Sequence, residues 1–239
     1  MNQPFILYQD KFVAAIYKPS GFHVVPHEQA QHRVSREFVL MYAARDLLNQ
    51  YVYPVHRLDA GTSGVVLFAL QKESARELAQ KFQFHDIEKT YEVVVRGYVP
   101  EKGRIDLPLE LDSTYELVPA ITDFVRLKTL ELPVAVGKRN PTARYSLVQA
   151  HPRSGRFHQI RRHFGRKSHP VLGDAAHGDS KHNRFFREEL GIAGLCLRAK
   201  RLELQVSWSL NGIEGNDPSK LVIESPVCEK WQRIHSLFA

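Results

Sequence analysis

The sequence has little of what marks several common protein classes. Its 239 residues include only two cysteines, Cys196 and Cys228, which are too few for a disulfide scaffold and indicate thiols kept in a reducing compartment. No stretch approaches the roughly 20 consecutive apolar residues of a membrane-spanning helix. The first residues place no basic segment ahead of an apolar run, so no secretory signal is indicated. These absences predict a cytoplasmic protein that does not enter a membrane.

Missing motifs narrow the chemistry further. The sequence contains neither G-x-x-x-x-G-K-[ST] nor G-x-G-x-x-G, so no nucleotide cofactor is indicated. Its 12 histidines raise the possibility of a metal-dependent hydrolase, but His158 and His163 do not share a helix face and no H-E-x-x-H is present. A serine nucleophile at Ser63, with His56 as its base, would lack the G-x-S-x-G turn. We therefore expect neither a metal nor a cofactor.

Positive charge is present but unevenly placed. Residues 1–120 hold 13 Lys+Arg and 15 Asp+Glu, a net charge of −2, whereas residues 121–239 hold 20 and 11, a net charge of +9. The window 153–167 has six basic residues and no acidic one, which indicates a surface for a polyanion such as nucleic acid. Apolar residues recur in this window with helical spacing: Phe157, Ile160 and Phe164. The pattern predicts a short amphipathic helix, whose charge requires an anion or an acid from elsewhere.

Hydrophobic periodicity predicts most of the remaining elements. Residues 5–8 and 12–17 alternate about a polar turn and predict a β-hairpin. Helices are predicted over residues 34–50, 72–85 and around Trp231, and in the first of these the apolar face is Phe38, Met41, Tyr42, Leu47 and Leu48. Further strands are predicted at residues 65–70, 91–97, 144–150, 195–197, 202–206 and 221–223.

The stretch HRLDAGTSG, residues 56–64, stands out because it places one carboxylate on a tight polar loop. Asp59 precedes two glycines and the apolar run VVLFAL, which reads as a buried strand. A rigid strand that fixes a loop is a typical support for a reacting side chain. The alternative is structural: Asp59 pairs with Arg57 or accepts main-chain hydrogen bonds in a turn.

Five motifs together closely resemble the RluA-type pseudouridine synthases. They are LYQDKFVAAIYKPSG, HRLDAGTSG, IEKTYEVVVRG, SGRFHQIRRHF and HPVLGD, in this order over residues 5–208. The resemblance implies an α+β fold with a long, largely antiparallel sheet, flanking helices and a central catalytic cleft. It also implies one catalytic domain over residues 1–239, made of two lobes that share the sheet, without an N-terminal S4 domain.

Two segments resemble the smaller, tRNA-directed members of that family: ELPVAVGKRNPTARY (Glu131–Tyr145) and HGDSKHNR (His177–Arg184). The resemblance implies isomerisation of uridine to pseudouridine in tRNA, at uridine 65 of the T stem, with no cofactor. We expect tRNA as the partner, no obligate protein partner, and a monomer. Two alternatives stay open: a ribosomal-RNA synthase of the same family, and an RNA-binding or chaperone protein with an idle site.

The resemblance also assigns residues to roles. Asp59 would act on the sugar, either as a nucleophile at C1′ or as a base that removes the C2′ proton. Arg161 would keep the Asp59 carboxylate charged and oriented, and Tyr91 would stack on the flipped uracil. Arg57 would enter the RNA helix where the uridine leaves. Ile160 and Leu172 would line the uracil pocket, although Leu172 could equally be ordinary packing. The expected phosphate contacts are Arg153, Arg156, Arg162, Arg166 and Lys167.

Overall fold

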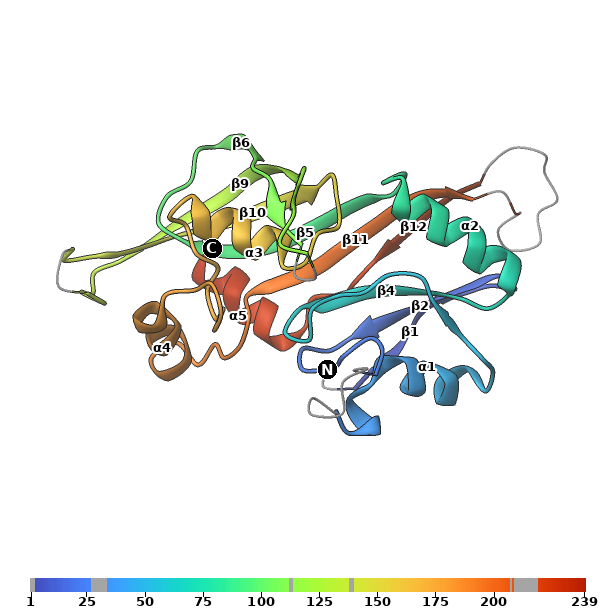
Figure 1. Cartoon of the computed structure of the whole chain (residues 1–239). Coiled ribbons are helices and arrows are strands. Elements are labelled where there is room, and N and C mark those ends of the chain that lie inside the picture. Colours follow the sequence, from blue (N-terminus) through green and yellow to red (C-terminus); the bar gives the residue numbers. More distant parts are fainter. Residues whose placement is uncertain (1–2, 27–33, 112–113, 138–139, 207, 209–218) are drawn as a thin grey trace. The chain divides into compact units, whose positions relative to one another are not determined.

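The computed structural model describes residues 3–26, 34–111, 114–137, 140–206, 208 and 219–239. These divide into two compact units. The first unit comprises Met1–Lys89 and Ala199–Pro226, and the second comprises Thr90–Arg198 and Val227–Ala239. The divisions at Lys89 and Arg198 fall inside strands β5 (Glu88–Arg96) and β11 (Leu197–Val206), each of which contributes residues to both units (Figure 1).

The first unit is built on a sheet in the order β1-β2-β4-β11, with β3 beside β4 and β12 beside β11. The remaining strand bounds are β1 Phe5–Gln9, β2 Val13–Lys18, β3 Tyr53–Pro54, β4 Ser63–Ala69 and β12 Ser219–Glu224. Strands β1 and β2 pair antiparallel with Phe5 opposite Tyr17, which confirms the predicted hairpin. The pairs β2–β4, β3–β4 and β11–β12 are antiparallel as well.

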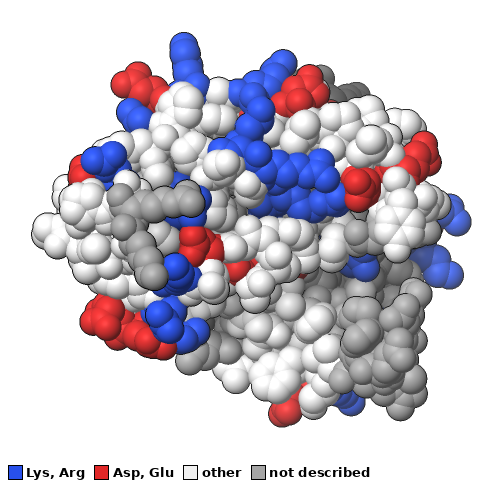
Figure 2. Space-filling model, turned by 60° about the vertical axis from the view of Figure 1, so that its left-hand side comes forward, with Lys and Arg blue, Asp and Glu red and all other residues white. Residues whose placement is uncertain are grey.

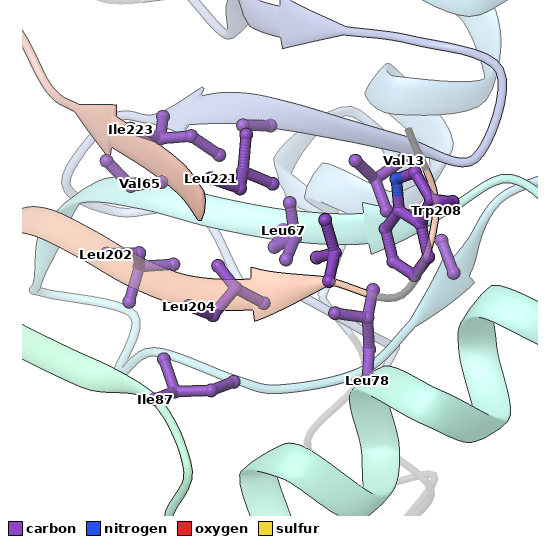
Figure 3. Close-up of a cluster of buried hydrophobic side chains, with 13 residues drawn as sticks. Val13, Val65, Leu67, Leu78, Ile87, Leu202, Leu204, Trp208, Leu221 and Ile223 are labelled. Carbon is purple, nitrogen blue, oxygen red and sulfur yellow. The ribbon is translucent and has the colours of Figure 1, made fainter. Parts of the chain in front are cut away.

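Both faces of this first sheet are covered, which explains why every residue of β2 and β4 is buried. Because side chains alternate along a strand, Ile16 and Phe68 face helix α1 (Leu40–Leu48), with Leu40 and Ala44 against them. The opposite face, shown in Figure 3, packs against Leu78 of helix α2 (Lys72–Gln83). That face also includes apolar residues from β11 and β12, among them Leu202, Leu204, Leu221 and Ile223.

The second unit has its own antiparallel sheet, in the order β5-β10-β9-β6. Its other strands are β6 Lys102–Asp106, β9 Ile121–Leu132 and β10 Ala143–Pro152, and a separate small hairpin is formed by β7 Leu109–Glu110 and β8 Leu117–Val118. One face packs on helix α3 (Gln159–Arg166) through Ile160 and Phe164. The other face packs on Phe186 of α4 (Ser180–Glu188) and Trp231 of α5 (Glu229–Leu237).

Some predicted elements differ from the structure. The predicted face of the first helix is only partly right: Met41 and Leu48 pack against the core, but Phe38 is 46% and Leu47 is 45% exposed, and the buried residues are Leu40 and Ala44. The physical reason is a short 3₁₀ turn at Arg36–Phe38, which delays the start of α1 until Leu40 and turns a different stripe inward. Strand β11 is continuous where two short strands were expected, and α4 had no counterpart among the predicted elements.

The predicted α+β class, with a largely antiparallel arrangement of strands and flanking helices, is confirmed. In each unit, apolar side chains on both faces of the sheet form hydrophobic clusters, and helices pack against these clusters. Within the described part of the chain, no helix is long and apolar enough to cross a membrane.

Candidate active site

The residues predicted to carry the chemistry fall in both units, so each half is described within its own unit. Asp59 and Arg57 belong to the first unit, whereas Tyr91, Arg161 and Leu172 belong to the second. In the first unit Arg57 is exposed and Asp59 is half-buried. That the Asp59 and Arg161 side chains face each other across a cleft stays a prediction.

The main chain of the Asp59 loop is fixed from several sides. The Thr62 N–H donates to the Asp59 carbonyl (3.0 Å) and closes the turn, while the Gly21 N–H donates to the Ala60 carbonyl (2.8 Å). The exit from the loop requires a glycine at position 64. Its φ is +123°, and a Cβ there would lie 2.0 Å from the Ala199 carbonyl oxygen of β11. The loop is therefore held rigidly at its turn and at its junction with β4.

Lys18 binds the main chain of this loop, and the sequence analysis did not single it out. The side chain is fully buried, and its ammonium donates to three main-chain carbonyls: Pro19 (3.1 Å), Phe22 (2.6 Å) and Ala60 (2.9 Å). An ammonium has three N–H donors, so this set is saturated. Burial lowers the pKa of Lys18 to about 7, and the negative charge of Asp59 opposes that shift. The sequence feature that could have indicated its burial is the position of this lysine, at the end of an apolar strand and just before the Pro-Ser-Gly turn.

His56 supports the loop from the other side and does not serve as a base for Ser63. Its Nε2 accepts a hydrogen bond from the Leu67 N–H (2.8 Å), and its ring stacks on Phe82 of α2 with 4.3 Å between centroids. Burial, together with the charge of Lys89, lowers the pKa of His56 to about 3. The imidazole is therefore neutral at physiological pH and acts as a structural acceptor between β4 and α2.

In the second unit, Arg161 on α3 is held by a carboxylate from the HPVLGD motif. Arg161 donates from Nε to Asp174 Oδ2 and from Nη2 to Asp174 Oδ1, each at 2.7 Å. The Asp174 side chain is fully buried and that of Arg161 is 10% exposed. Burial works to raise the pKa of Asp174, but the hydrogen bonds from Arg161 hold it below its ordinary value. This bidentate pair fixes one edge of the guanidinium.

Four of the five other basic residues of the 153–167 window have acceptors within the second unit. Arg153 pairs with Asp123 (2.8 Å). Three others donate to main-chain carbonyls: Arg156 to Pro119, Arg162 to Glu110 and Arg166 to Pro108. The acid and the acceptors that this basic helix requires therefore come in part from the protein itself. Figure 2 shows that Lys and Arg side chains adjoin one another over part of the face drawn there, with Asp and Glu nearby.

The residues assigned to the uracil pocket lie at or near buried positions. Tyr91 is half-buried at the start of β5, opposite Ala150 of β10, and packs against the cluster that contains Ile160. Ile160 is 5% exposed, and Leu172 is 1% exposed and packs with Phe186 and other core residues. Packing thus accounts for Leu172 without a ligand, and the pocket assignment stays a prediction.

Two histidines near the start of α3 form a pair. His158 Nδ1 and His177 Nε2 are 3.1 Å apart, and the His158 ring stacks on the exposed ring of Phe157 at 3.7 Å between centroids. Across the described ranges, no group of three or more His, Cys, Asp or Glu side chains has the arrangement of a metal site.

Comparison with known proteins agrees with the motifs. Residues 13–165 match the family model described as RNA pseudouridylate synthase. A tRNA pseudouridine synthase C from Pectobacterium carotovorum subsp. carotovorum is 46% identical over 209 residues, which cover 83% of this chain and 54% of that protein. The chain thus spans about half the length of that relative. The protein of the same name from Vibrio cholerae serotype O1 is 39% identical over 243 residues, which cover 98% of this chain and 95% of that protein.

A solved structure shares the fold. Human RNA Pseudouridylate Synthase Domain Containing 1 has a TM-score of 0.69 at 19% identity, covering 99% of this chain and 95% of that chain. The likeness to this solved structure shows the fold alone. The chain belongs to the RNA pseudouridylate synthase family, as its motifs predicted.

Proposed function

We propose that this chain converts uridine to pseudouridine in tRNA, at uridine 65 of the T stem. Membership of the family supports the reaction type. The tRNA substrate is supported by two relatives that are both named tRNA pseudouridine synthase C, one of which is similar over 98% of this chain. The segments Glu131–Tyr145 and His177–Arg184, which resemble tRNA-directed members, support the narrower choice of target.

The observation that carries the proposal is the fixed loop that presents Asp59. Lys18, Gly21 and Thr62 hold the main chain of residues 59–60, and Asp59 itself is half-buried rather than fully exposed. A carboxylate held in this way is prepositioned for attack or proton abstraction and needs little reorganisation. Asp59 attacks C1′ of the uridine sugar or removes the C2′ proton. In the first route an Asp59–C1′ bond forms as the C1′–N1 bond breaks, and C5 then displaces the carboxylate from C1′. In the second route the C2′ proton and the uracil leave together, and the proton returns to C2′ when C5 bonds to C1′. In both routes the base turns, C5 loses its proton and N1 gains one.

The second unit supplies the groups that complete the reaction. Arg161 places a guanidinium beside the catalytic carboxylate and keeps it ionised. Tyr91 stacks on the uracil while the base turns, with Ile160 and Leu172 closing the pocket around it. No group enters or leaves the product, so no cofactor is required.

The RNA is held mainly through its phosphates. Arg57 enters the helix where the uridine leaves, since a base-paired target must be extruded before it reacts. The phosphate contacts are Arg153, Arg156, Arg162, Arg166 and Lys167. Such contacts position the RNA without reading its sequence, so recognition of a T-stem uridine depends on shape and 2′-hydroxyl groups. We place this activity in the cytoplasm, carried out by a monomer.

The test is tritium release from tRNA that carries [5-³H]uridine, because C5 must lose its hydrogen in the reaction. We expect release by the wild-type protein and a loss on the order of 10⁴-fold in the Asp59→Asn variant. Asp46→Asn is the matched control, since Asp46 is an exposed carboxylate on α1 of the same unit. A tRNA in which uridine 65 is replaced by cytidine should release no tritium above background.

The outcomes separate the alternatives. Release from ribosomal RNA but not from tRNA would keep the chemistry and discard the substrate. Equal release by Asp59→Asn and wild type would remove Asp59 from the mechanism. Tight RNA binding with no release from either RNA would favour an RNA-binding or chaperone protein with an idle site.

A further inference from the structure

The turn that leads into α3 exposes an aromatic ring within a strongly basic segment. Phe157 is 52% exposed, although Gln159, Ile160 and Arg161, which follow it closely, are all buried. Six basic residues and no acidic residue lie within positions 153–167. An apolar ring in contact with water is unfavourable unless a ligand covers it. The structure thus places uncovered apolar surface among side chains that are suited to a polyanion.

The main chain that carries Phe157 is fixed by a buried glutamine. The Gln159 N–H donates to the Arg156 carbonyl (3.1 Å) and closes the turn. The Gln159 side chain accepts from the Arg156 N–H (3.0 Å) and from Ser154 Oγ (2.8 Å), and it donates to the Ile121 carbonyl of β9 (2.9 Å). The position of Phe157 is therefore set by bonds to the sheet and not by the ring itself.

The Phe157 ring is held in turn by the imidazole of His158. The two centroids are 3.7 Å apart and the ring planes differ by 21°. His158 has a left-handed backbone, with φ +51° and ψ 28°, which is unfavourable for a residue other than glycine. Its Nδ1 lies 3.1 Å from His177 Nε2, and the His177 N–H donates to Asp174 Oδ1 (3.0 Å). One face of Phe157 is thus backed by a fixed imidazole while about half of the residue stays open to solvent.

We propose that Phe157, backed by His158, stacks on a nucleobase of the substrate RNA that lies next to the target uridine. These two residues are called the stacking platform below. The inference rests on the proposed function, because it takes an RNA that undergoes this reaction as the ligand. It assigns a base contact to a segment whose other proposed contacts are all to phosphates.

The chemistry of the surroundings favours a nucleobase as the occupant. Every base has a π face, and aromatic rings set among basic side chains are a general way to bind unpaired nucleotides without reading their sequence. Arg162 Nη1 donates to the carbonyls of Glu110 (2.9 Å) and Phe157 (3.4 Å), so a guanidinium lies beside the turn. A nucleotide supplies an aromatic face and a negative charge together, whereas an apolar protein surface would leave this positive charge uncompensated.

The position of the platform in the chain indicates which base it covers. Extrusion of a paired uridine unstacks the bases on either side of it and exposes their faces to water. Phe157 precedes Ile160, which is assigned to the uracil pocket, by three residues, and three residues span at most about 11 Å. Successive nucleotides of one strand are spaced by about 3.4 Å along a duplex. The ring is therefore within reach of a base beside the target.

The first experiment measures tRNA affinity in the Asp59→Asn background, so that the RNA is not converted during the titration. For Phe157→Ala we expect binding to weaken by about 5- to 150-fold, which is the effect of losing one stacked base. Phe157→Tyr keeps the ring and should bind within about twofold of the parent protein. Phe84→Ala is the matched control, because Phe84 is 73% exposed at the end of α2 in the other unit, and it should not change the affinity.

Two further measurements separate stacking from folding and from charge. The melting temperature of Phe157→Ala should change by less than about 2 °C, since a half-exposed ring is removed. The slope of log affinity against log salt concentration should stay the same in Phe157→Ala, whereas it should fall by about 0.7–0.9 in Arg166→Gln, which removes a proposed phosphate contact. In Phe157→Trp the added indole should be quenched by tRNA, against a background of two buried tryptophans, Trp208 and Trp231.

A double-mutant cycle identifies the base. An abasic nucleotide is placed on either side of uridine 65 in turn, and the affinity of each RNA is measured with and without Phe157→Ala. At the contacted position the two losses should not add, because each removes the same interaction. Full additivity at both positions would overturn the assignment to a neighbouring base.

The results also distinguish this inference from the proposed function. If the wild type releases tritium while Phe157→Ala binds tRNA with unchanged affinity, the stacking platform is overturned and the proposed function stands. If the wild type releases no tritium but Phe157→Ala still weakens RNA binding at an unchanged salt slope, the proposed reaction fails and the base contact stands. A fall in the salt slope equal to that of Arg166→Gln would overturn stacking in favour of a disturbed phosphate contact.

Discussion

Each of the two units buries a cation, and the two cations are stabilised in different ways. In the first unit, the Lys18 ammonium is surrounded by three main-chain carbonyls. In the second unit, the Arg161 guanidinium meets the buried carboxylate of Asp174. Carbonyl dipoles satisfy the hydrogen bonds of a cation but carry no opposite charge, so burial lowers the pKa of Lys18 to about 7. The comparison shows that one site is built to fix a backbone and the other to fix a charge.

The largest expected effect comes from breaking the charged pair. Arg161→Met leaves the Asp174 carboxylate buried without its counterion, and we expect a loss of about 3–5 kcal/mol in the free energy of unfolding, measured in urea. The double variant Arg161→Met/Asp174→Leu removes both charges and should regain most of that loss. If the double variant is less stable than Arg161→Met, the loss in Arg161→Met is not explained by an unpaired buried carboxylate.

Removal of the Lys18 ammonium should lower the free energy of unfolding by less than removal of the Arg161 guanidinium. Lys18→Met leaves the Pro19, Phe22 and Ala60 carbonyls without a donor, but it also relieves the burial of an ammonium. We expect a net loss of about 2–3 kcal/mol in the same urea titration at pH 7. A loss as large as that of Arg161→Met would contradict the distinction between the two sites.

The pH dependence of the first site sharpens the comparison. The folded-state pKa of Lys18 is about 7, whereas an unfolded lysine titrates near 10.5. Between these values the unfolded chain binds more protons, so stability rises with pH. The wild type should gain up to about 1.4 kcal/mol per pH unit relative to Lys18→Met above pH 7. A constant difference between the two proteins from pH 7 to 9 would argue against the lowered pKa.

The stability that the Arg161–Asp174 pair contributes should fall in acid. Near neutral pH it should hardly change, so this is the smallest of the expected effects. Arg161 holds the pKa of Asp174 below its ordinary value, so the pair contributes its full stability above about pH 4 and loses it as pH falls through the folded-state pKa. In acid, the wild type should therefore lose stability relative to Asp174→Asn. Thermal unfolding between pH 5 and 3 measures this difference, and parallel curves would contradict it.

Much of the fold could be predicted from the sequence because its signals were local. The first hairpin and helix α2 follow from alternation and helical spacing within a few residues. Helix α4 was missed because its sequence SKHNRFFRE is mostly polar, and only Phe186 is buried. Strand β11 was predicted as two pieces because Arg198 and Lys200 interrupt its apolar pattern, whereas the buried Glu92 accommodates Arg198.

The residues proposed for the site came from sequence motifs, whereas their hydrogen-bond partners could not be predicted. Family motifs indicated Asp59 and Arg161 directly. The bond between Arg161 and Asp174 joins a helix to a later turn, and no local pattern specifies which of the nearby polar groups will meet. Lys18 was not singled out because a lysine next to Pro-Ser-Gly is ordinarily exposed, and its hydrogen bonds reach a carbonyl 42 positions away.

The route of the chain through the two units has a consequence for how the protein is made. The core of the first unit joins Val13 to Leu202 and Leu221, and Trp208 Nε1 donates to Asp10 across 198 positions. At about 5–20 residues per second, the ribosome takes roughly 5–20 s to pass from Lys89 to Ala199. During that time β4 has been synthesised but its partner strand β11 has not. An apolar strand with an open edge invites association with other chains. We therefore expect the nascent chain to depend on chaperones while the second unit is synthesised.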